Sequence, residues 1–293
     1  RRSEHHIAGT RMPPLLSLGW WLAHFMVMRK VKERLGFHRM RLAFSGAAPI
    51  APDVLRFFHA IGLHLVEGYG QTEGTGVTTA STVAAFRPGT VGRPLPGCEL
   101  KIAEDGEILV RSPGVFAGYF GDAAATAETL QDGWLHTGDV GALDEDGFLR
   151  IVDRKKDVII TAGGKNIAPQ VIENKLKFSP YINDAIAIGD ARKFVSALIV
   201  LDEENVSKFA QEERIPFSTY ADLAASQDVR RLIDGEVQRV NDELARVEQV
   251  RTFTILPNRL YEEEGDVTPT MKVKRRVLEK KYGELIEAMY REG

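Results

Sequence analysis

The sequence has very little cysteine and almost no excess of charge, and each shortage excludes a class of protein. Cys98 is the single cysteine among 293 residues, so an intrachain disulfide and a cysteine-based zinc cage are both excluded. This usage is typical of a reducing compartment, and we expect a cytoplasmic location. The formal net charge of −3 gives no reason to expect a nucleic-acid partner, because such binding depends on neutralising phosphates with lysine and arginine.

The sequence also lacks an apolar run long enough to cross a membrane. The run PLLSLGWWLAHFMVM at residues 14–28 is shorter than the roughly 20 residues that a span needs, and Arg29 opens a basic flank behind it. We favour a buried helix whose partner surface lies in another part of the protein, because short apolar runs are usually core. The alternative is peripheral contact with the inner membrane surface through Trp20, Trp21 and Phe25.

The most informative run that is present is EGYGQTEG at residues 67–74. It places glycines, an aromatic ring, a hydroxyl and a carboxylate next to one another, at Gly68, Tyr69, Gly70, Thr72 and Glu73. A tyrosine ring offers a face to a purine, glycine lets a ligand approach the backbone, threonine bonds phosphate oxygen and glutamate ligates Mg²⁺. The run is also similar to the dinucleotide-binding pattern GxGxxG, but Glu73 displaces the third glycine, and we reject that interpretation.

Residues 41–83 predict the order strand, helix, strand. The strands are expected around RLAFSG and LHLVEGYG, with APDVLRFFHAIG as the helix between them. Ligands of open α/β sheets bind at the carboxyl ends of the strands, so FSGAAP and EGYGQTEG should lie on the binding rim. There the small residues Gly46, Ala47 and Ala48 would let a flat ligand lie against the backbone. We therefore expect an α/β region over residues 1–88.

A different pattern follows at residues 89–155, where short strands are separated by tight turns. The turns EDG at 104–106 and DEDG at 144–147 carry the Asp-Gly pair that tolerates a positive φ. We expect a β-rich, barrel-like subdomain here, with strands at CELKIA, EILVR and FLRIVD. Residues 1–155 would then form one large domain that ends within the charged run DRKKD.

Residues 156–293 predict a smaller α+β domain. Its strands are expected at VIIT, AIAIG, ALIVL and TFTIL. Its helices are expected over residues 169–178, 203–212, 228–248 and 274–291.

Five motifs occur in order along the chain, and the order is more specific than any one of them. They are EGYGQTEG at 67–74, HTGD at 136–139, DRKKD at 153–157, TAGGKNIAP at 161–169 and TPTMKVKRR at 268–276. The set resembles the adenylate-forming superfamily of acyl-CoA synthetases, luciferases and peptide-synthetase adenylation domains, and most closely its long-chain fatty-acyl-CoA synthetases. The resemblance runs from about Arg41 to Gly293.

The family's phosphate-gripping loop, a Ser/Thr/Gly-rich run ending Pro-Lys-Gly, is not in this sequence. The resemblance therefore implies the C-terminal half of a longer enzyme. On that basis residues 1–155 are the C-terminal portion of the large AMP-binding domain, and residues 156–293 are a mobile C-terminal domain. The N-terminal half of the same enzyme would be the missing partner.

The resemblance implies a two-step reaction that uses ATP, Mg²⁺ and CoA. A fatty-acid carboxylate attacks the α-phosphate of ATP, forms an acyl-adenylate and releases pyrophosphate, and the CoA thiol then displaces AMP. Glu73 would hold Mg²⁺ and, with Thr72, would stabilise charge on the phosphates. Tyr69 would stack on adenine, Asp139 would accept the ribose hydroxyls, and Arg154 would donate to the same sugar. The small residues lining the nucleotide would be Gly46, Ala47, Ala48, Gly68 and Gly70.

Lys272 matches the family's catalytic lysine, whose ammonium bridges the substrate carboxylate and the α-phosphate. Taken alone, this lysine in a basic run would be a surface residue. Its neighbours Thr268, Pro269 and Thr270 reproduce the long-chain subgroup's version of the motif, although Met271 stands where other branches carry glycine.

Lys156 matches the family's hinge residue, about which the second domain is expected to rotate between the two steps. That rotation would withdraw Lys272 and present the turn of Gly163, Gly164 and Lys165 to the adenylate. The glycine pair would let the pantetheine arm of CoA pass, and a side chain at Gly164 should obstruct it. A tight turn between a strand and a helix is the alternative reason for paired glycines.

The sequence thus predicts an ATP-dependent long-chain fatty acid:CoA ligase, with little turnover from this chain alone because one wall of the site is absent. Two alternatives remain. One is a non-catalytic nucleotide-binding module that serves a separate partner, and the other is an acyl-AMP ligase that serves a carrier protein. The intact glycine pair disfavours the second. His136, within HTGD, is expected to be a structural hydrogen-bonding residue.

Overall fold

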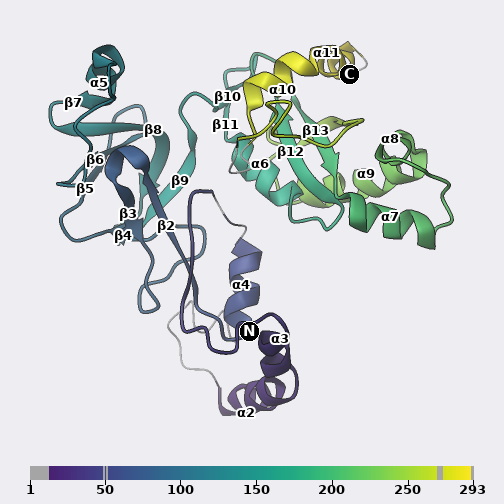
Figure 1. Ribbon diagram of the computed structural model, residues 1–293, viewed down its shortest axis with the longest axis horizontal. Helices are drawn as coiled ribbons and strands as arrows, with labels where there is room; N and C mark the ends of the chain where they lie inside the picture. Colours follow the sequence, from purple (N-terminus) through teal and green to yellow (C-terminus); the bar gives the residue numbers. More distant parts are fainter. Residues whose placement is uncertain (1–12, 49, 51, 269–272, 292–293) are drawn as a thin grey trace. The chain divides into compact units, whose positions relative to one another are not determined.

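The computed structural model describes residues 13–48, 50, 52–268 and 273–291. The chain divides into two compact units, Arg1–Lys156 and Asp157–Gly293. This division falls inside DRKKD, the run in which the sequence places its boundary. Each unit has its own sheets and helices (Figure 1).

The described part of the first unit starts with three helical segments, two of which form hydrogen bonds with the C-terminal end of helix α4 (Pro52–Ala60) and the residues just after it. These segments are α2 (Pro14–Ala23), the π-helical η1 (His24–Met28) and α3 (Arg29–Arg34). Trp20 Nε1 donates to the carbonyl of Ala60 over 3.4 Å, and Lys32 Nζ donates to that of Gly62 over 3.1 Å. No residue of α2, η1 or α3 is buried by the described part of the chain. The predicted helix is therefore present, but its apolar face is uncovered.

A four-stranded sheet, in the order β1-β2-β3-β4, follows this region. Its strands are β1 (Ala43–Ser45), β2 (Leu65–Gln71), β3 (Gly76–Ala80) and β4 (Arg93–Pro94). Strands β1 and β2 are parallel and α4 connects them, which confirms the predicted strand, helix, strand order. A short 3-10 helix, η2 (Thr72–Gly74), reverses the chain from β2 into antiparallel β3.

The rest of the first unit is a five-stranded antiparallel sheet with α5 (Ala123–Thr129), which Asp122 caps by accepting from the Ala125 N–H. The strands are β5 (Glu99–Ile102), β6 (Glu107–Arg111), β7 (Leu130–Gln131), β8 (Trp134–Leu143) and β9 (Leu149–Arg154). The order is β5-β6-β8-β7, and β9 also pairs with β8. The predicted β-rich region is present, but within the described residues its sheet stays open and forms no closed barrel.

The second unit is built on the three-stranded sheet β12-β13-β14 and the short pair β10-β11. Its strands are β10 (Ile159–Ile160), β11 (Asn166–Ile167), β12 (Ile182–Ile188), β13 (Val195–Leu201) and β14 (Val250–Ile255). Its helices are α6 (Pro169–Leu176), α7 (Glu203–Glu212), α8 (Tyr220–Ala225), α9 (Gln227–Asn241), α10 (Arg275–Lys281) and α11 (Gly283–Arg291). This architecture is the predicted α+β domain.

Alternating residues of the central strand β13 face two different apolar clusters. Ile199 packs with residues of α6 and α9 on one face, and Leu198 packs with residues of α10 and α11 on the other. Helices α10 and α11, yellow in Figure 1, lie on the face of this sheet to which Leu198 points. Both faces of the sheet are therefore covered within the second unit.

Two predicted helices are shorter than expected. The helix predicted over 228–248 ends at Asn241, whose side-chain amide donates to the carbonyl of Val250 and whose Oδ1 accepts the Val250 N–H. The helix predicted over 274–291 is two helices, because Tyr282 between them has φ −108° and ψ 22°. At Asn241 a specific tertiary contact accompanies the end of the helix, which apolar periodicity does not predict.

Candidate functional site

Two glycines of EGYGQTEG, Gly68 and Gly70, lie where neighbouring strands and side chains leave no room for a Cβ. A Cβ on Gly68 would lie 2.3 Å from the ring of Phe44 and 2.9 Å from the carbonyl oxygen of Thr79. A Cβ on Gly70 would lie 1.7 Å from the carbonyl oxygen of Gly76. Close packing in the sheet thus accounts for both glycines, and their contact with a ligand stays a prediction.

The loop after β1 presents small residues to solvent. Gly46, Ala47 and Ala48 are all exposed, and Ala47 has a left-handed φ of 68°. Gly46 is close to β2, because an added Cβ would come within 3.3 Å of the carbonyl oxygen of Gly68. The loop and β2 are therefore adjacent at the carboxyl ends of the two parallel strands.

Three of the predicted residues gather where β2, β8 and β9 meet. The Tyr69 hydroxyl donates to Asp139 Oδ2 over 2.6 Å, and Arg154 Nε lies 3.5 Å from Asp139 Oδ1. Asp139 and Arg154 are direct neighbours in the β8-β9 ladder. Burial, and then the Asp139 carboxylate, raises the pKa of Tyr69, so this hydroxyl remains a donor. All three residues are predicted from the sequence, but the hydrogen bond and the ion pair that connect them are not.

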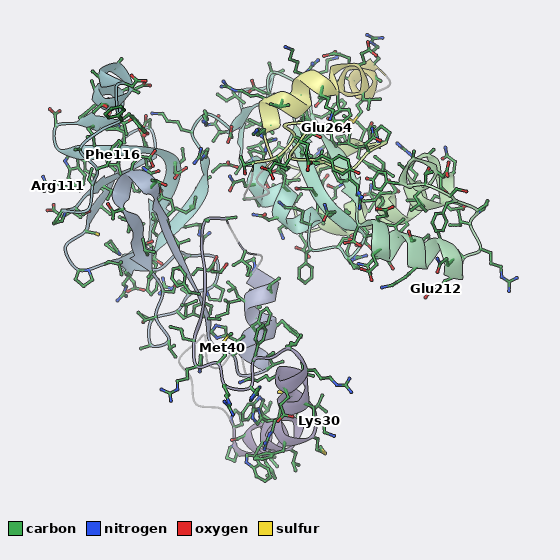
Figure 2. The ribbon with its side chains drawn as sticks, in the orientation of Figure 1. Lys30, Met40, Arg111, Phe116, Glu212 and Glu264 are labelled. Carbon is green, nitrogen blue, oxygen red and sulfur yellow. The ribbon has the colours of Figure 1, made fainter. Side chains whose placement is uncertain are left out.

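Thr72 and Glu73 lie on η2, at the end of β2. Thr72 is exposed, and Glu73 is half-buried. Glu73 Oε1 accepts a hydrogen bond from the Tyr119 hydroxyl over 2.7 Å, and the Glu73 carbonyl accepts the Phe116 N–H over 2.8 Å. Phe116 is labelled in Figure 2. The hydrogen bond to Glu73 raises the pKa of Tyr119.

A magnesium site at Glu73 would contain at most two His, Cys, Asp or Glu side chains of the described residues. No cluster of three or more His, Cys, Asp or Glu side chains suitable for a metal occurs in the part of the chain that the structure describes. Mg²⁺ in nucleotide enzymes commonly takes one or two carboxylates and completes its shell with phosphate oxygens and water. Glu73 therefore fits a metal that arrives with a nucleotide, and it does not fit a protein-only metal site.

The HTGD motif lies within β8, and a buried glutamate supports it. Glu107 Oε1 accepts the Gly138 N–H over 2.9 Å, and Oε2 lies 3.2 Å from His136 Nδ1. Lys155 Nζ donates to the same Oε2 over 3.1 Å. His136 thus lies within hydrogen-bonding distance of a buried carboxylate, and its structural role stays a prediction.

The predicted residues of the second unit lie on an exposed turn. Gly163, Gly164 and Lys165 connect β10 to β11, and the Gly164 N–H donates to the carbonyl of Thr161 over 2.8 Å. Gly164 has φ +70°, whereas nothing lies closer than 3.9 Å to a Cβ placed on Gly163. Lys156 is exposed at the end of the first unit.

Lys272 lies outside the described residues. Side-chain hydrogen bonds anchor the described segments before and after it. Arg275 Nη2 donates to Glu173 Oε1 over 2.6 Å, and its Nη1 donates to the carbonyl of Ala187 over 2.6 Å. On the other side, Lys281 Nζ donates to both carboxylate oxygens of buried Asp266 over 2.9 Å. Lys281 also donates to Glu264, which is labelled in Figure 2.

Sequence reasoning missed Tyr119 and Glu107 as contributors to the site in the first unit. Each contacts a motif residue from 31 or more positions away in the chain. Only the placement of Glu107, at the start of a strand whose next three residues are apolar, offered a signal. The partners themselves follow from tertiary pairing.

Two family models match the chain. The AMP-binding enzyme model matches residues 15–120, and the model of the AMP-binding enzyme C-terminal domain matches residues 156–293. The matched ranges contain EGYGQTEG in the first unit and TAGGKNIAP in the second. The chain belongs to the AMP-binding enzymes, the adenylate-forming class that its motifs predict.

A curated relative in this family has a stated activity. Long-chain-fatty-acid–CoA ligase FadD15 of Mycobacterium bovis is 44% identical over 266 residues, a match that covers 90% of this chain and 44% of the relative. The chain spans about half the length of the curated relatives it matches.

Solved structures share the fold. The A domain of carboxylic acid reductase from Segniliparus rugosus, in complex with AMP and a carboxylic acid, has a TM-score of 0.73 at 23% identity over 99% of this chain and 44% of its own. O-succinylbenzoate CoA synthetase from Bacillus subtilis, in complex with ATP and magnesium, has a TM-score of 0.63 at 29% identity over 82% of this chain and 46% of its own.

Proposed function

We propose that this chain carries the nucleotide site of an ATP-dependent long-chain fatty acid:CoA ligase. The observation that carries the proposal is the cluster of Tyr69, Asp139 and Arg154. Within this cluster Tyr69 lies on β2, three residues before Thr72, so the cluster is connected directly to the turn that carries Thr72 and Glu73. The activity stated for FadD15 supports the choice of substrate class.

The ribose would bind at Asp139. Each carboxylate oxygen can accept two hydrogen bonds, so the two ribose hydroxyls can be accepted while Tyr69 keeps its bond to Oδ2. Arg154 would neutralise the carboxylate and donate to the sugar. The Tyr69 ring, fixed at its hydroxyl end, would stack on adenine, and Gly46, Ala47 and Ala48 would lie along the same nucleotide.

The first half-reaction forms a bond between a fatty-acid carboxylate oxygen and the α-phosphorus, and pyrophosphate leaves. Thr72 would donate to an α-phosphate oxygen, where charge increases in the transition state. Glu73 would be the protein ligand of Mg²⁺, which supplies charge neutralisation on the phosphates. Lys272 would bridge the carboxylate and the α-phosphate.

The second half-reaction forms a thioester between the CoA sulfur and the acyl carbon, and AMP leaves. We place the rotation between half-reactions at Lys156, and the CoA arm at Gly163, Gly164 and Lys165. Replacing Gly163 tests the arm better than replacing Gly164, because the φ of +70° at Gly164 would strain any side chain. With the N-terminal complement present, Gly163→Leu should preserve acyl-adenylate formation and abolish thioester formation, and equal loss of both would contradict this placement.

The acyl tunnel and the phosphate-gripping loop would belong to an N-terminal complement. Two observations support it: the chain spans about half the length of its relatives, and the apolar side chains of α2 and η1 are exposed, Leu15 by 86% and Met26 by 62%. The complement would cover this face. Among the described residues no helix has both the length and the hydropathy of a membrane span. Peripheral contact of α2 with the inner membrane surface is the competing explanation of its exposed face.

The testing experiment measures pyrophosphate release and acyl-CoA formation with palmitate, ATP, Mg²⁺ and CoA. We expect neither product from this chain alone and both when the N-terminal complement is added. A non-catalytic nucleotide-binding module would bind AMP but give neither product with the complement. An acyl-AMP ligase would release pyrophosphate and form no acyl-CoA.

A further inference from the structure

The carboxylate of Glu107 connects two motifs of the first unit. Its side chain is only 8% exposed, and its two oxygens have different partners. Oε1 accepts the N–H of Gly138, the residue before Asp139, whereas Oε2 accepts from Lys155 Nζ and lies beside His136 Nδ1. One buried carboxylate is thus bonded both to HTGD and to DRKKD.

Lys155 is held at its backbone as well as at its side chain. Its N–H donates to the carbonyl of Gly138 over 2.9 Å, which extends the β8-β9 ladder by one residue beyond Arg154. Its ammonium also lies 2.6 Å from Asp105 Oδ2, at the turn between β5 and β6. The ladder and this ion cluster end at Lys155, and the next residue, Lys156, is exposed where the first unit ends.

The charges of this cluster are mutually stabilising. Burial alone would raise the pKa of Glu107, but the Gly138 N–H, Lys155 and His136 outweigh it and hold that pKa below its ordinary value. The hydrogen bonds to Asp105 and Glu107 raise the pKa of Lys155. Glu107 and Lys155 are therefore both ionised at neutral pH, and the bond between them is charge-assisted.

Gly138 has a left-handed φ of 69°, a conformation that its neighbours must maintain. Thr137 Oγ1 accepts the Asp139 N–H over 3.2 Å, and Glu107 accepts the N–H of Gly138 itself. These two bonds fix the backbone on the N-terminal side of Asp139. The direction of the Asp139 carboxylate depends on that backbone.

We propose that Glu107 is a positioning residue with two effects: it orients Asp139 for the ribose through Gly138, and it immobilises Lys155 so that chain rotation begins at Lys156. The inference deepens the proposed function and rests on it for the role of Asp139. Glu107 itself touches neither substrate nor the reacting atoms in this account.

The test uses the 293-residue chain, with AMP affinity measured by calorimetry and amide exchange measured over residues 150–160. Glu107→Gln keeps the shape of the side chain and removes its charge. We expect its affinity for AMP to fall about tenfold, the change that loss of one charge-assisted hydrogen bond produces. We also expect the Lys155 amide to exchange about tenfold faster, because its ammonium loses a charged partner.

Lys155→Met separates the two effects. It removes the tether, by which we mean the contacts of the Lys155 ammonium with Glu107 and Asp105, and it leaves the bond between Glu107 and Gly138. Exchange at residue 155 should therefore quicken by a similar factor, while AMP affinity should change less than twofold. Glu99→Gln is the matched control: Glu99 lies on β5 of the same sheet, pairs with Arg111 at the surface, and should change neither readout.

The outcomes discriminate between the claims. Unchanged AMP affinity in Glu107→Gln, with binding by the unaltered chain, would overturn the orienting effect. Unchanged exchange in Lys155→Met, which tests the tether even if Glu107→Gln does not fold, would overturn the tether. Failure of the unaltered chain to bind AMP would contradict the proposed function and the orienting effect with it, whereas the exchange result still decides the tether.

Discussion

The two units differ in how completely they bury their own apolar side chains. In the second unit apolar clusters cover both faces of the β12-β13-β14 sheet. In the first unit one described apolar cluster surrounds Ile108 and Leu149, and the α2 face stays exposed among the described residues. The second unit therefore contains its own packing partners, whereas the first presents surface suited to a further part of the protein.

Two buried glutamates, one from each unit, differ in how their carboxylates are paired. Glu173 of the second unit accepts from Arg275 and from the Ala187 N–H. Glu67 of the first unit is 6% exposed, and its Oε2 has no hydrogen-bond partner among the described residues. A buried carboxylate without a cation beside it is costly when it is charged. Burial accordingly raises the pKa of Glu67, whereas Glu173 has Arg275 as its cation.

The largest expected effect is on the ion pair of the second unit. Arg275→Met leaves the Glu173 carboxylate buried without its cation, and we expect a loss of about 3–5 kcal/mol in the unfolding free energy of residues 157–293. Urea unfolding with exchange readout on β12 and β13 measures it. Arg231→Met, which breaks the exposed pair with Asp228, is the control and should cost under about 1 kcal/mol. Equal effects would show that burial of the pair is unimportant.

The next largest effect is on the pH dependence of the first unit's stability. Burial raises the pKa of Glu67 to about 7 from an ordinary 4.5. Because the folded state retains this proton to higher pH than the unfolded chain, the group's contribution to stability falls as the pH rises from about 4.5 to about 7. Glu67→Gln should therefore stabilise the first unit at pH 8, by at most about 3 kcal/mol, and by nothing below pH 4.5.

Unfolding of the unaltered chain and of Glu67→Gln at pH 4.5 and pH 8 makes this measurement. A pH-independent difference between the two proteins would contradict the raised pKa. Addition of the N-terminal complement then shows whether a cation or donor outside this chain relieves the same group.

The smallest expected effect is on α2. Leu18 is 58% exposed, so Leu18→Asn should change the unfolding free energy of this chain by under about 0.5 kcal/mol. It should weaken association with the N-terminal complement, and a pull-down between the two parts measures that. Undiminished association, together with reduced binding to vesicles of anionic lipid, would assign the face to a membrane surface instead.

Local patterns predicted much of this fold. The β1-α4-β2 order, the strands at CELKIA, EILVR and FLRIVD, and the α+β second unit follow from apolar periodicity and Asp-Gly turns. The open form of the five-stranded sheet did not follow, because it depends on pairing between distant segments. The break between α10 and α11 at Tyr282 did not follow from apolar periodicity either.

The site divides in the same way. Motif residues such as Tyr69 and Asp139 are visible in sequence, but the hydrogen bond that joins them spans 70 positions. The packing reason for Gly68 and Gly70 is likewise invisible, since Phe44 and Gly76 approach them only in the folded sheet. Glu107 is the clearest example, because no sequence pattern near it predicts Gly138 or Lys155 as its hydrogen-bond partners.

Calorimetric titration of AMP into this chain, compared with its Asp139→Ala variant, tests the central claim most directly. The account predicts saturable binding by the unaltered chain and at least tenfold weaker binding by the variant, because the carboxylate between Tyr69 and Arg154 would accept the ribose hydroxyls. Absence of saturable binding, or equal binding by both proteins, would contradict the assignment of this cluster as the nucleotide site.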